Sequence, residues 1–390
     1  MFEIDVTIAG GGVVGCAVAA ACARKGWSVV LLEQEAGLGR ATTSRNSQVS
    51  HGGMYYPAGS LKARYCVAGR RMLKEFCLDH GVGYQECGKL IVATSADQLG
   101  ELERLHALGT ENGVEDLRLL DAGELSRLEP GIDGVAALHS PRTGILDAEG
   151  VAKAFARVAV GGGAQVMTGA RLAGLERAPS GWLVSVESGA VERESWRHGS
   201  RCVVNAAGLW ADRVAALAGI DPVARNWSLH LSRGNYFAVD PRHTGKVGHL
   251  VYPVPPADGS TLGAHVCLDL GGRMRLGPDY ELLAGDPRPA DGRFGLDADL
   301  DYRVDPARAA EFFAGARTFL PWLEIEDLTP DMCGLRPKLC LHGFRDFEVS
   351  RESDPDLVGL INLVGIDSPG LTSSPALAEA VAGLAAEILA

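Results

Sequence analysis

The chain has 390 residues, of which 37 are Lys or Arg and 49 are Asp or Glu, so its formal net charge at pH 7 is −12. This charge, with no Lys/Arg run to offset it, argues against a nucleic-acid partner. Hydrophobic residues make up 46% and charged residues 22%, which is typical of globular chains and not of disordered ones. At ~150 residues per domain, the length suggests two or three domains.

The cysteines and the N-terminal segment indicate where the protein works. Nine cysteines are scattered without a CxxC pair or metal-ligand spacing, which predicts reduced thiols, no metal site and a cytoplasmic protein. The apolar residues 6–23 resemble a signal peptide, but the preceding Met-Phe-Glu-Ile-Asp is acidic where a signal peptide is positively charged. No other apolar stretch approaches the ~20 residues that span a bilayer, so we expect no integral membrane segment. Association with a membrane surface stays open.

The predicted elements begin with a βαβ unit. A short buried strand, a helix of small residues and a second strand leading to Glu33 are expected at residues 4–9, 13–25 and 28–32. Apolar spacing then predicts a helix, a strand, an amphipathic helix and a short helix at residues 61–80, 88–94, 96–109 and 120–128.

The pattern changes after Gly144. A helix, a strand, a hairpin-like pair and another strand are expected at residues 147–160, 164–168, 170–177 with 182–188, and 202–206. Further strand-like pieces lie at residues 234–239, 249–254, 261–268 and 357–364, and an Ala-rich helix closes the chain at residues 374–389. The fold class predicted is α/β: a discontinuous Rossmann-like domain of residues 1–85, 145–218 and 345–390, interleaved with an α+β domain built on an antiparallel sheet, of residues 86–144 and 219–344.

The glycines that follow the first strand match a dinucleotide-binding fingerprint. Gly10, Gly12 and Gly15 fit GxGxxG between a strand and a helix. Gly10 permits the tight turn, Gly12 leaves room for a pyrophosphate, and Gly15 lets helix and strand pack closely. Glu33, 18 residues after Gly15, would accept the hydroxyls of an adenosine ribose and disfavours the 2′-phosphate of NADP. The fingerprint alone does not choose between FAD and NAD.

Five later segments resemble one known family. They are Ser44-Arg45-Asn46-Ser47-Gln48-Val49-Ser50-His51-Gly52-Gly53-Met54-Tyr55-Tyr56, Asn205-Ala206-Ala207-Gly208-Leu209-Trp210-Ala211-Asp212, Leu262-Gly263-Ala264-His265 with Gly277-Pro278, Gly334-Leu335-Arg336-Pro337-Lys338, and Gly365-Ile366-Asp367-Ser368-Pro369-Gly370-Leu371-Thr372. Together they resemble the D-amino-acid-oxidase-like FAD superfamily (GR2/DAO-type FAD-binding domain), and within it the L-2-hydroxyglutarate dehydrogenase/oxidase group. The group has small or aliphatic residues where Gln48 and Ser50 stand and a Thr near Cys267, so the resemblance does not specify the hydroxy acid.

The resemblance implies FAD as cofactor and a set of contacts to it. The residues expected to bind FAD are Gly10, Gly12, Val13, Val14, Gly15, Glu33, Gln34, Thr43, Ser44, Arg45, Asn46, Ser47, His51, Gly52, Gly53, Val166, Ala206, Ala207, Gly208, Trp210, Arg336, Asp367, Ser368, Pro369, Gly370, Leu371 and Thr372. Residues 370–373, which we expect to precede the final helix, would direct N–H groups at the flavin pyrimidine edge. An ordinary N-cap by Ser373 or Ser374 is compatible with this role. Related amine oxidases attach flavin through a Cys near the position of Cys333, but we expect a buried free thiol there.

Oxidation of a 2-hydroxy acid to a 2-keto acid needs a base for the hydroxyl proton, a hydride acceptor and a cation for the carboxylate. His51 and His265 are the candidate bases, because both fall in segments that the resemblance places near the flavin. We expect His265 as the base and His51 as a positioner on the flavin side. Arg336 is the expected carboxylate clamp, since a guanidinium binds a carboxylate bidentately. Further substrate contacts are expected from Tyr55, Tyr56, Arg275 and Lys338.

The sequence therefore predicts an FAD-dependent oxidoreductase for a small acidic substrate of the 2-hydroxyglutarate type. An amine or amino-acid oxidase on the same scaffold is the alternative, because one fold hosts both chemistries. A non-enzymatic flavin-binding protein is a remote third reading. The electron acceptor, whether oxygen, a quinone or another protein, stays open.

Overall fold

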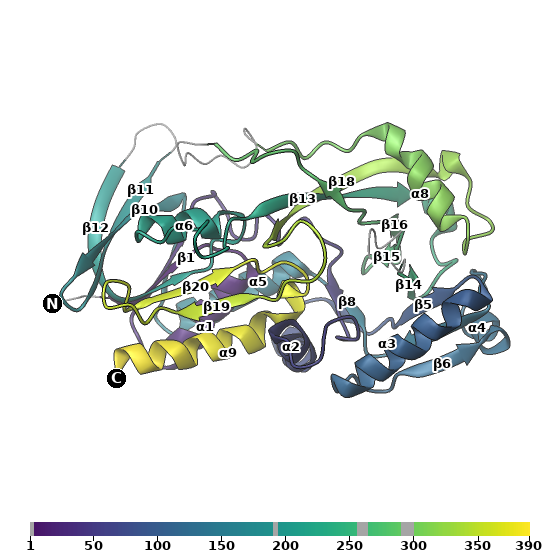
Figure 1. Cartoon of the computed structure of the whole chain (residues 1–390), viewed down its shortest axis with the longest axis horizontal. Helices are drawn as coiled ribbons and strands as arrows, with labels where there is room; N and C mark the ends of the chain where they lie inside the picture. Colours follow the sequence, from purple (N-terminus) through teal and green to yellow (C-terminus); the bar gives the residue numbers. More distant parts are fainter. Residues whose placement is uncertain (1–3, 190–193, 256–263, 290–299) are drawn as a thin grey trace.

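An eight-stranded sheet with a parallel centre forms one end of the molecule in the computed structural model, which describes residues 4–189, 194–255, 264–289 and 300–390 (Figure 1). Its parallel strands run in the order β20-β12-β1-β2-β9, and the antiparallel β19 pairs with β20. The bounds are β1 (Ile4–Ala9), β2 (Val29–Glu33), β9 (Gln165–Thr168), β12 (Glu194–Asn205), β19 (Glu348–Arg351) and β20 (Leu360–Val364). N-terminal, middle and C-terminal parts of the chain thus lie side by side in one sheet.

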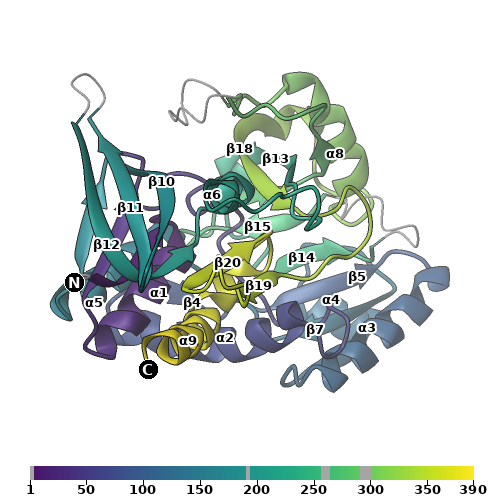
Figure 2. The ribbon, with the colours of Figure 1, turned by 60° about the vertical axis from the view of Figure 1, so that its left-hand side comes forward.

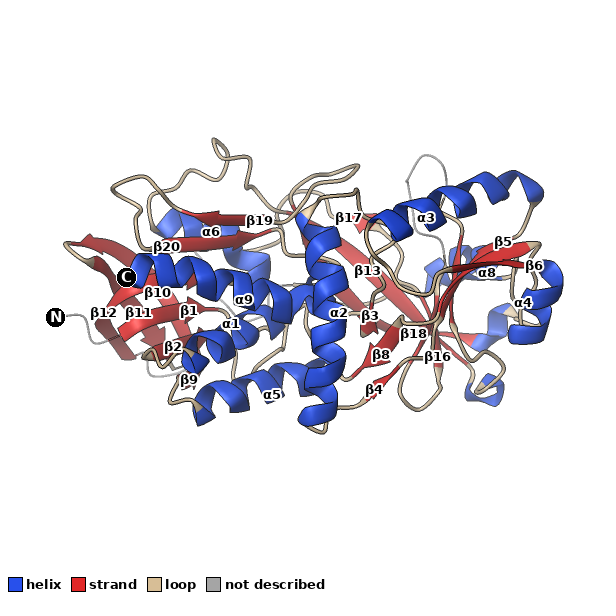
Figure 3. Cartoon of the chain, turned by 90° about the horizontal axis from the view of Figure 1, so that it is seen from below, coloured by secondary structure: helices blue, strands red, loops and turns tan. Residues whose placement is uncertain are grey.

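Both faces of this sheet are covered, because its strands are apolar on both sides. Ile8, Leu31 and Val204 pack against the helices α1 (Val13–Arg24), α5 (Ala148–Gly161) and α9 (Gly370–Leu389). Figure 3 shows these helices in front of the strands, with α2 (Leu61–Asp79) beside α9. Val30 and Val203 face the other way, onto α6 (Ala211–Leu217) and the hairpin of β10 (Ala170–Ala178) and β11 (Gly181–Ser188). Figure 2 shows this hairpin continuing into β12.

A second, mostly antiparallel sheet of nine strands forms the other end of the molecule within the described residues. Its strands are β5 (Lys89–Ala93), β6 (Arg118–Asp121), β7 (Ala136–Ser140), β13 (His230–Val239), β14 (Leu250–Pro253), β15 (Val266–Leu268), β16 (Met274–Leu276), β17 (Glu281–Leu282) and β18 (Leu328–Lys338). Figure 1 shows α8 (Ala309–Ala316) above this end, and α3 (Leu99–Glu111) and α4 (Ala122–Leu128) below it. The long β13 and β18 reach back towards the first sheet, which positions the site between the two sheets.

A small sheet and several short helices complete the described chain. The sheet pairs β3 (Val49–Ser50) and β4 (Tyr84–Gln85) with β8 (Gly144–Leu146). The 3₁₀ helices span Ala96–Gln98, Gly208–Trp210, Pro241–His243, Pro306–Arg308 and Ile325–Asp327. No helix of the described residues is long and apolar enough to cross a membrane.

Most predicted elements are confirmed to within a few residues. The strand expected at residues 202–206 begins earlier, at Glu194, and two helices differ at their N-termini. Residues 120 and 121 end β6 instead of starting a helix, because Asp121 caps α4 through Glu124 N–H. The final helix begins at Gly370, so residues 370–373 form its first turn and the N-cap is Pro369, not Ser373 or Ser374. β18 was not predicted, because its prolines are rare in strands; they pair here with β13. Residues 261–263 of the expected strand lie outside the described residues, and only 266–268 form β15.

Candidate active site

A single long pocket joins residues from both ends of the chain. It is lined by the turn after β1, the 40–51 segment, the loop after β12, parts of β13, β14 and β18, and the turn into α9. The expected site residues that line it are Gly10, Gly12, Val13, Val14, Glu33, Gln34, Thr43, Arg45, Asn46, Ser47, His51, Ala206, Ala207, Gly208, Trp210, His265, Arg336, Asp367, Ser368, Pro369, Gly370 and Leu371.

The turn between β1 and α1 forms a cradle that only glycine backbones allow. Gly10 has a φ of +111°, and a Cβ atom there would lie 2.4 Å from the carbonyl oxygen of Ala206. At Gly15 a Cβ would lie 1.9 Å from the carbonyl oxygen of Gly10. Gly12 is the N-cap of α1 and offers no side-chain cap, and Thr43 Oγ1 accepts from Val13 N–H at 3.0 Å. The helix N-terminus therefore presents backbone N–H groups to the pocket, as an anion requires.

Glu33 lies at the end of β2, at the edge of this cradle. Its Oε2 accepts from Gly11 N–H at 2.6 Å and its Oε1 from Glu35 N–H at 2.8 Å. Burial raises the pKa of the Glu33 carboxyl, although these backbone hydrogen bonds oppose the shift. The carboxyl is thereby fixed in one orientation at the pocket wall.

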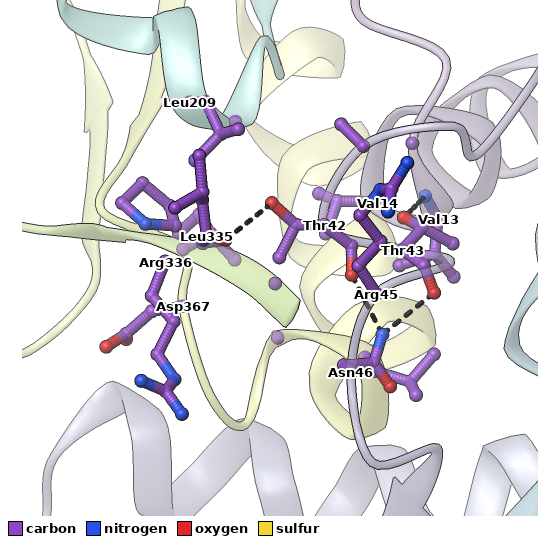
Figure 4. A pocket seen from close by; sticks show the side chains of 18 of the residues that line it. Val13, Val14, Thr42, Thr43, Arg45, Asn46, Leu209, Leu335, Arg336 and Asp367 are labelled. Atoms are coloured by element: carbon purple, nitrogen blue, oxygen red, sulfur yellow. Dashed lines mark hydrogen bonds between the residues drawn. The ribbon is translucent and has the colours of Figure 1, made fainter. Parts of the chain in front are cut away.

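The 40–47 segment connects the cradle to the second sheet (Figure 4). Thr42 Oγ1 donates to the carbonyl oxygen of Leu335 in β18 at 3.1 Å, and Asn46 Nδ2 donates to the carbonyl oxygens of Thr42 and Thr43. A Cβ at Gly334 would lie 1.9 Å from the carbonyl oxygen of Arg45, so only glycine lets the strand approach this closely. β18 is thus held against the segment that follows the cradle.

The first turn of α9 forms another part of the pocket wall. Its N-cap, Pro369, makes no side-chain cap. Thr372 Oγ1 accepts from His51 N–H at 3.0 Å and donates to the carbonyl oxygen of Val49, which ties the helix to the segment after β3. Asp367 accepts from Lys62 Nζ at 2.7 Å and forms an ion pair with Lys338 Nζ at 3.3 Å.

Both candidate bases lie in one aromatic and basic cluster. His265 is buried and its ring stacks on Tyr252, with centroids 3.8 Å apart and planes 7° from parallel. His51 Nδ1 lies 3.4 Å from Lys89 Nζ, and Lys89 Nζ lies 3.8 Å from the centroid of Tyr252. Burial, the charge of Lys89 and the proximity of His265 hold the pKa of His51 well below its usual value of 6.5. The His51 imidazole is therefore neutral over the physiological range, as a general base must be.

Arg336 lies on β18 with its guanidinium against backbone carbonyls. It donates to the carbonyl oxygens of Asp279 at 3.0 Å and Arg233 at 3.4 Å. Within the ranges that the structure describes, it forms no ion pair with a carboxylate. Gly234 leaves the room for it, because a Cβ there would lie 2.4 Å from a guanidinium nitrogen. The positive charge of Arg336 thus remains available to an anionic ligand in the pocket.

Ten expected site residues lie outside the lining that the described residues form. Lys338 pairs with Asp367, Arg275 pairs with Asp331, and neither side chain reaches the pocket. The others are Gly15, Ser44, Gly52, Gly53, Tyr55, Tyr56, Val166 and Thr372. Cys333 is buried and also lies outside the lining.

The three residues that depart from the family pattern also lie outside the pocket lining. Gln48 Oε1 accepts from Ala148 N–H, Ser50 Oγ accepts from the Tyr84 hydroxyl, and Cys267 Sγ donates to a carbonyl oxygen. These contacts hold neighbouring segments together. The departures therefore act on the pocket only through its supporting residues.

Sequence reasoning missed Tyr236, Tyr252 and Lys89. The two tyrosines line the pocket, and Tyr236 hydroxyl lies 3.0 Å from Ser47 Oγ. Both fall in segments predicted as strands, but nothing in one sequence distinguishes a pocket tyrosine from a core tyrosine. Lys89 had a signal: it begins the otherwise apolar strand Lys-Leu-Ile-Val-Ala, where a buried charge needs a reason.

Comparison with known proteins identifies the family of this chain. The family model described as FAD dependent oxidoreductase (DAO) matches residues 5–384, which is nearly the whole chain. The chain belongs to this family of FAD-dependent oxidoreductases. An FAD-dependent enzyme fits the pocket described above, which offers an anion cradle at α1 and a second helix N-terminus at α9.

Three curated relatives of this FAD-dependent oxidoreductase share the name L-2-hydroxyglutarate dehydrogenase. L-2-hydroxyglutarate dehydrogenase of Arabidopsis thaliana, a mitochondrial protein, is 36% identical over 97% of this chain and 83% of its own length. The human mitochondrial enzyme of that name is 36% identical over 72% of this chain and 61% of its own. The Escherichia coli K12 enzyme is 32% identical over 71% and 64%.

Solved structures confirm the fold of this FAD-dependent oxidoreductase. L-α-glycerophosphate oxidase from Mycoplasma pneumoniae, solved with FAD bound, has a TM-score of 0.81 at 26% identity and covers 99% of this chain and 94% of its own. Glycine oxidase from Geobacillus kaustophilus has a TM-score of 0.77 at 21% identity, covering 99% and 95%, which shows the shared fold alone. No group of side chains suited to a metal ion occurs in the described ranges.

Proposed function

We propose that this enzyme oxidises a small 2-hydroxy acid of the 2-hydroxyglutarate type to the 2-keto acid. The observation that carries the proposal is the pocket wall that combines the guanidinium of Arg336 with the neutral imidazole of His51 and the buried ring of His265. The shared name of the curated relatives supports the same substrate class. FAD, when bound, accepts the hydride that leaves C2.

The chain's own residues divide the remaining work. Arg336 would bind the substrate carboxylate and fix C2 in the pocket. We propose His51 as the acceptor of the hydroxyl proton, which reverses the preference for His265 drawn from the sequence. The reason is that His51 has a basic partner, Lys89, at its Nδ1 atom, while the ring of His265 is stacked on Tyr252 and almost fully buried. His265 would then orient the substrate next to Tyr252.

The FAD-binding contacts expected from the sequence remain part of this proposal. Gly10, Gly12 and Gly15 would form the pyrophosphate cradle, Glu33 would contact the adenosine ribose, and the first turn of α9 would face the flavin ring. The remaining expected substrate contacts would act indirectly, through the residues that line the pocket; they are Tyr55, Tyr56, Arg275 and Lys338. The division of the chain into two interleaved domains at the boundaries given above is proposed likewise.

We expect purified protein to be yellow, to release FAD on denaturation, and to bleach anaerobically with one substrate class. L-2-hydroxyglutarate, lactate, malate, glycine and L-amino acids form the test panel. Bleaching by at least one hydroxy acid, with the matching keto acid formed, supports the proposal. Bleaching by amines or amino acids alone makes the chain an amine oxidase of the same fold.

Replacing Arg336 by Lys is expected to weaken substrate binding by about 1.5–3 kcal/mol, because a lysine cannot form the bidentate charged hydrogen bonds. This corresponds to a roughly 10- to 150-fold higher apparent dissociation constant for the substrate. Arg273→Lys, at an exposed turn, is the matched control and should leave the constant unchanged. The constant is measured from the substrate dependence of anaerobic flavin bleaching. An unchanged constant for Arg336→Lys would remove Arg336 from the carboxylate site.

We propose that the protein works in the cytoplasm, on the evidence of its nine free cysteines. The acceptor that reoxidises the flavin would be oxygen, a quinone or another protein. Steady-state assays with oxygen and with a soluble quinone analogue distinguish the first two from the third.

A further inference from the structure

Lys89 is a buried lysine to which the proposed chemistry gives no role so far. Its side chain is 0% exposed and lies between two residues of the pocket wall. Nζ is 3.4 Å from His51 Nδ1 and 3.8 Å from the centroid of Tyr252. Since His265 stacks closely on the same Tyr252 ring, Lys89 and His265 occupy opposite faces of that ring. Among the described residues that line the pocket, Lys89 contacts His51 and Tyr252.

No carboxylate compensates this lysine among the residues that the structure describes. The titratable groups around it are the imidazole of His51, the phenols of Tyr55 and Tyr252, and the thiols of Cys66, Cys87 and Cys267. Burial raises the pKa of Cys66 to about 12 and those of Cys87 and Cys267 to about 11, so the thiols stay neutral. Burial lowers the pKa of Lys89 to about 8. A neutral amine is thus accessible to Lys89 close to physiological pH.

The contact between Lys89 and His51 determines which nitrogen of His51 carries the proton. A charged Lys89 has only donors, so it donates to Nδ1 and the neutral ring must carry its hydrogen on Nε2. A neutral Lys89 has a lone pair that accepts Nδ1–H, which leaves Nε2 free to take a proton. Since Nδ1 is engaged by Lys89, Nε2 is the nitrogen that remains for a substrate. Only the state with neutral Lys89 is competent as a base.

We propose that Lys89 is a positioning residue that completes a proton relay with His51. The substrate O–H bond breaks as Nε2–H forms, and the Nδ1–H bond breaks as an N–H bond forms on the Lys89 amine. One proton moves through the pair, and the two electrons leave with the C2 hydride to bound FAD. The relay rests on the proposed function, because it presumes a substrate hydroxyl at His51.

The relay predicts that flavin reduction by a hydroxy acid rises with pH through about 8, where Lys89 loses its proton. Protonation of His51 itself cannot cause this rise of the rate (the pH limb), since the pKa of His51 lies well below 6.5. Lys89→Met should remove the limb near 8 and lower the limiting reduction rate ~10-fold or more, because the acceptor behind His51 is gone. Lys89→Arg, protonated at every accessible pH, should be slow throughout. Substrate affinity should change little in either variant, since Lys89 does not line the pocket.

Lys153→Met, at an exposed helix position paired with Glu149, is the control and should keep both the rate and the limb. A purely structural role for Lys89 would instead lower FAD content and thermal stability and leave the pH limb in place. FAD content and unfolding temperature are therefore measured for every variant.

A readout independent of activity is the tautomer of His51 in the FAD-loaded protein. ¹⁵N-histidine NMR, with His51→Asn used to assign the signals, reports it between about pH 6 and about pH 10. The relay predicts Nε2–H at low pH, Nδ1–H above about 8, and Nε2–H at every pH in Lys89→Arg. A tautomer that does not change with pH in the wild-type protein overturns the relay, whether or not a variant folds. If the tautomer switches but no hydroxy acid bleaches the flavin, the pair stands and the proposed substrate is wrong.

Discussion

His51→Asn is expected to slow flavin reduction by substrate ~10²–10⁴-fold while FAD stays bound. Asparagine keeps a hydrogen-bonding side chain of similar size but cannot accept the hydroxyl proton. The backbone of His51 is held independently by Thr372 Oγ1 and by the Cys66 thiol, so the segment should keep its position. Anaerobic stopped-flow absorbance of the flavin measures the rate directly.

Two further variants are needed to interpret this result. His265→Asn should lower the rate of flavin reduction less than His51→Asn does, because His265 is proposed to orient the substrate and not to accept its proton. His106→Asn, on the surface helix α3, should react at the wild-type rate. Near-normal reduction in His51→Asn, with a large loss in His265→Asn, would restore His265 as the base. Near-normal reduction in both would exclude His51 and His265 as the base.

Gly12→Val is expected to abolish FAD binding. Within the protein, a Cβ at Gly12 meets only Thr43 Oγ1 at 3.3 Å, so the fold can accommodate it with a small shift. The valine methyl groups would, however, occupy the space in front of the α1 N-terminus, where the pyrophosphate must approach the backbone N–H groups. The flavin absorbance per protein chain and titration with added FAD measure the loss.

The control for this loss is Gly100→Val, on helix α3, where a Cβ would meet no other atom within 4 Å. It should retain FAD, and both variants should unfold cooperatively. Gly15→Val is less informative, because its Cβ would collide with the carbonyl oxygen of Gly10 and disrupt the helix–strand packing itself. A Gly12→Val protein that is folded and still yellow would place the pyrophosphate elsewhere.

The sequence predicted those features whose signal is local. The glycine fingerprint predicted the turn between β1 and α1, because each glycine has a steric reason there. The apolar period predicted the helices of the first sheet. β18 escaped prediction because Pro330 and Pro337 are unusual in strands. They are tolerated here because β18 is an edge strand that pairs, among the described strands, with β13 alone, and the register shifts beside Pro330.

The site was predictable where it follows a motif and unpredictable where it depends on packing. The resemblance brought His51, His265 and Arg336 to one pocket, and the structure places all three in its wall. The contact of Lys89 with His51 joins residues 38 positions apart and depends on how β5 packs beside the segment after β3. Likewise, Arg275 forms an ion pair with Asp331 and does not line the pocket, and no sequence pattern predicts that pair.

The most direct test of the central claim is anaerobic flavin reduction by L-2-hydroxyglutarate carrying hydrogen or deuterium at C2. If the enzyme removes the C2 hydrogen as hydride, the flavin bleaches with one keto acid formed per FAD, and the deuterated substrate reacts measurably more slowly. If the flavin stays oxidised with this and every other 2-hydroxy acid, while an amine or amino acid bleaches it, the proposed function is contradicted.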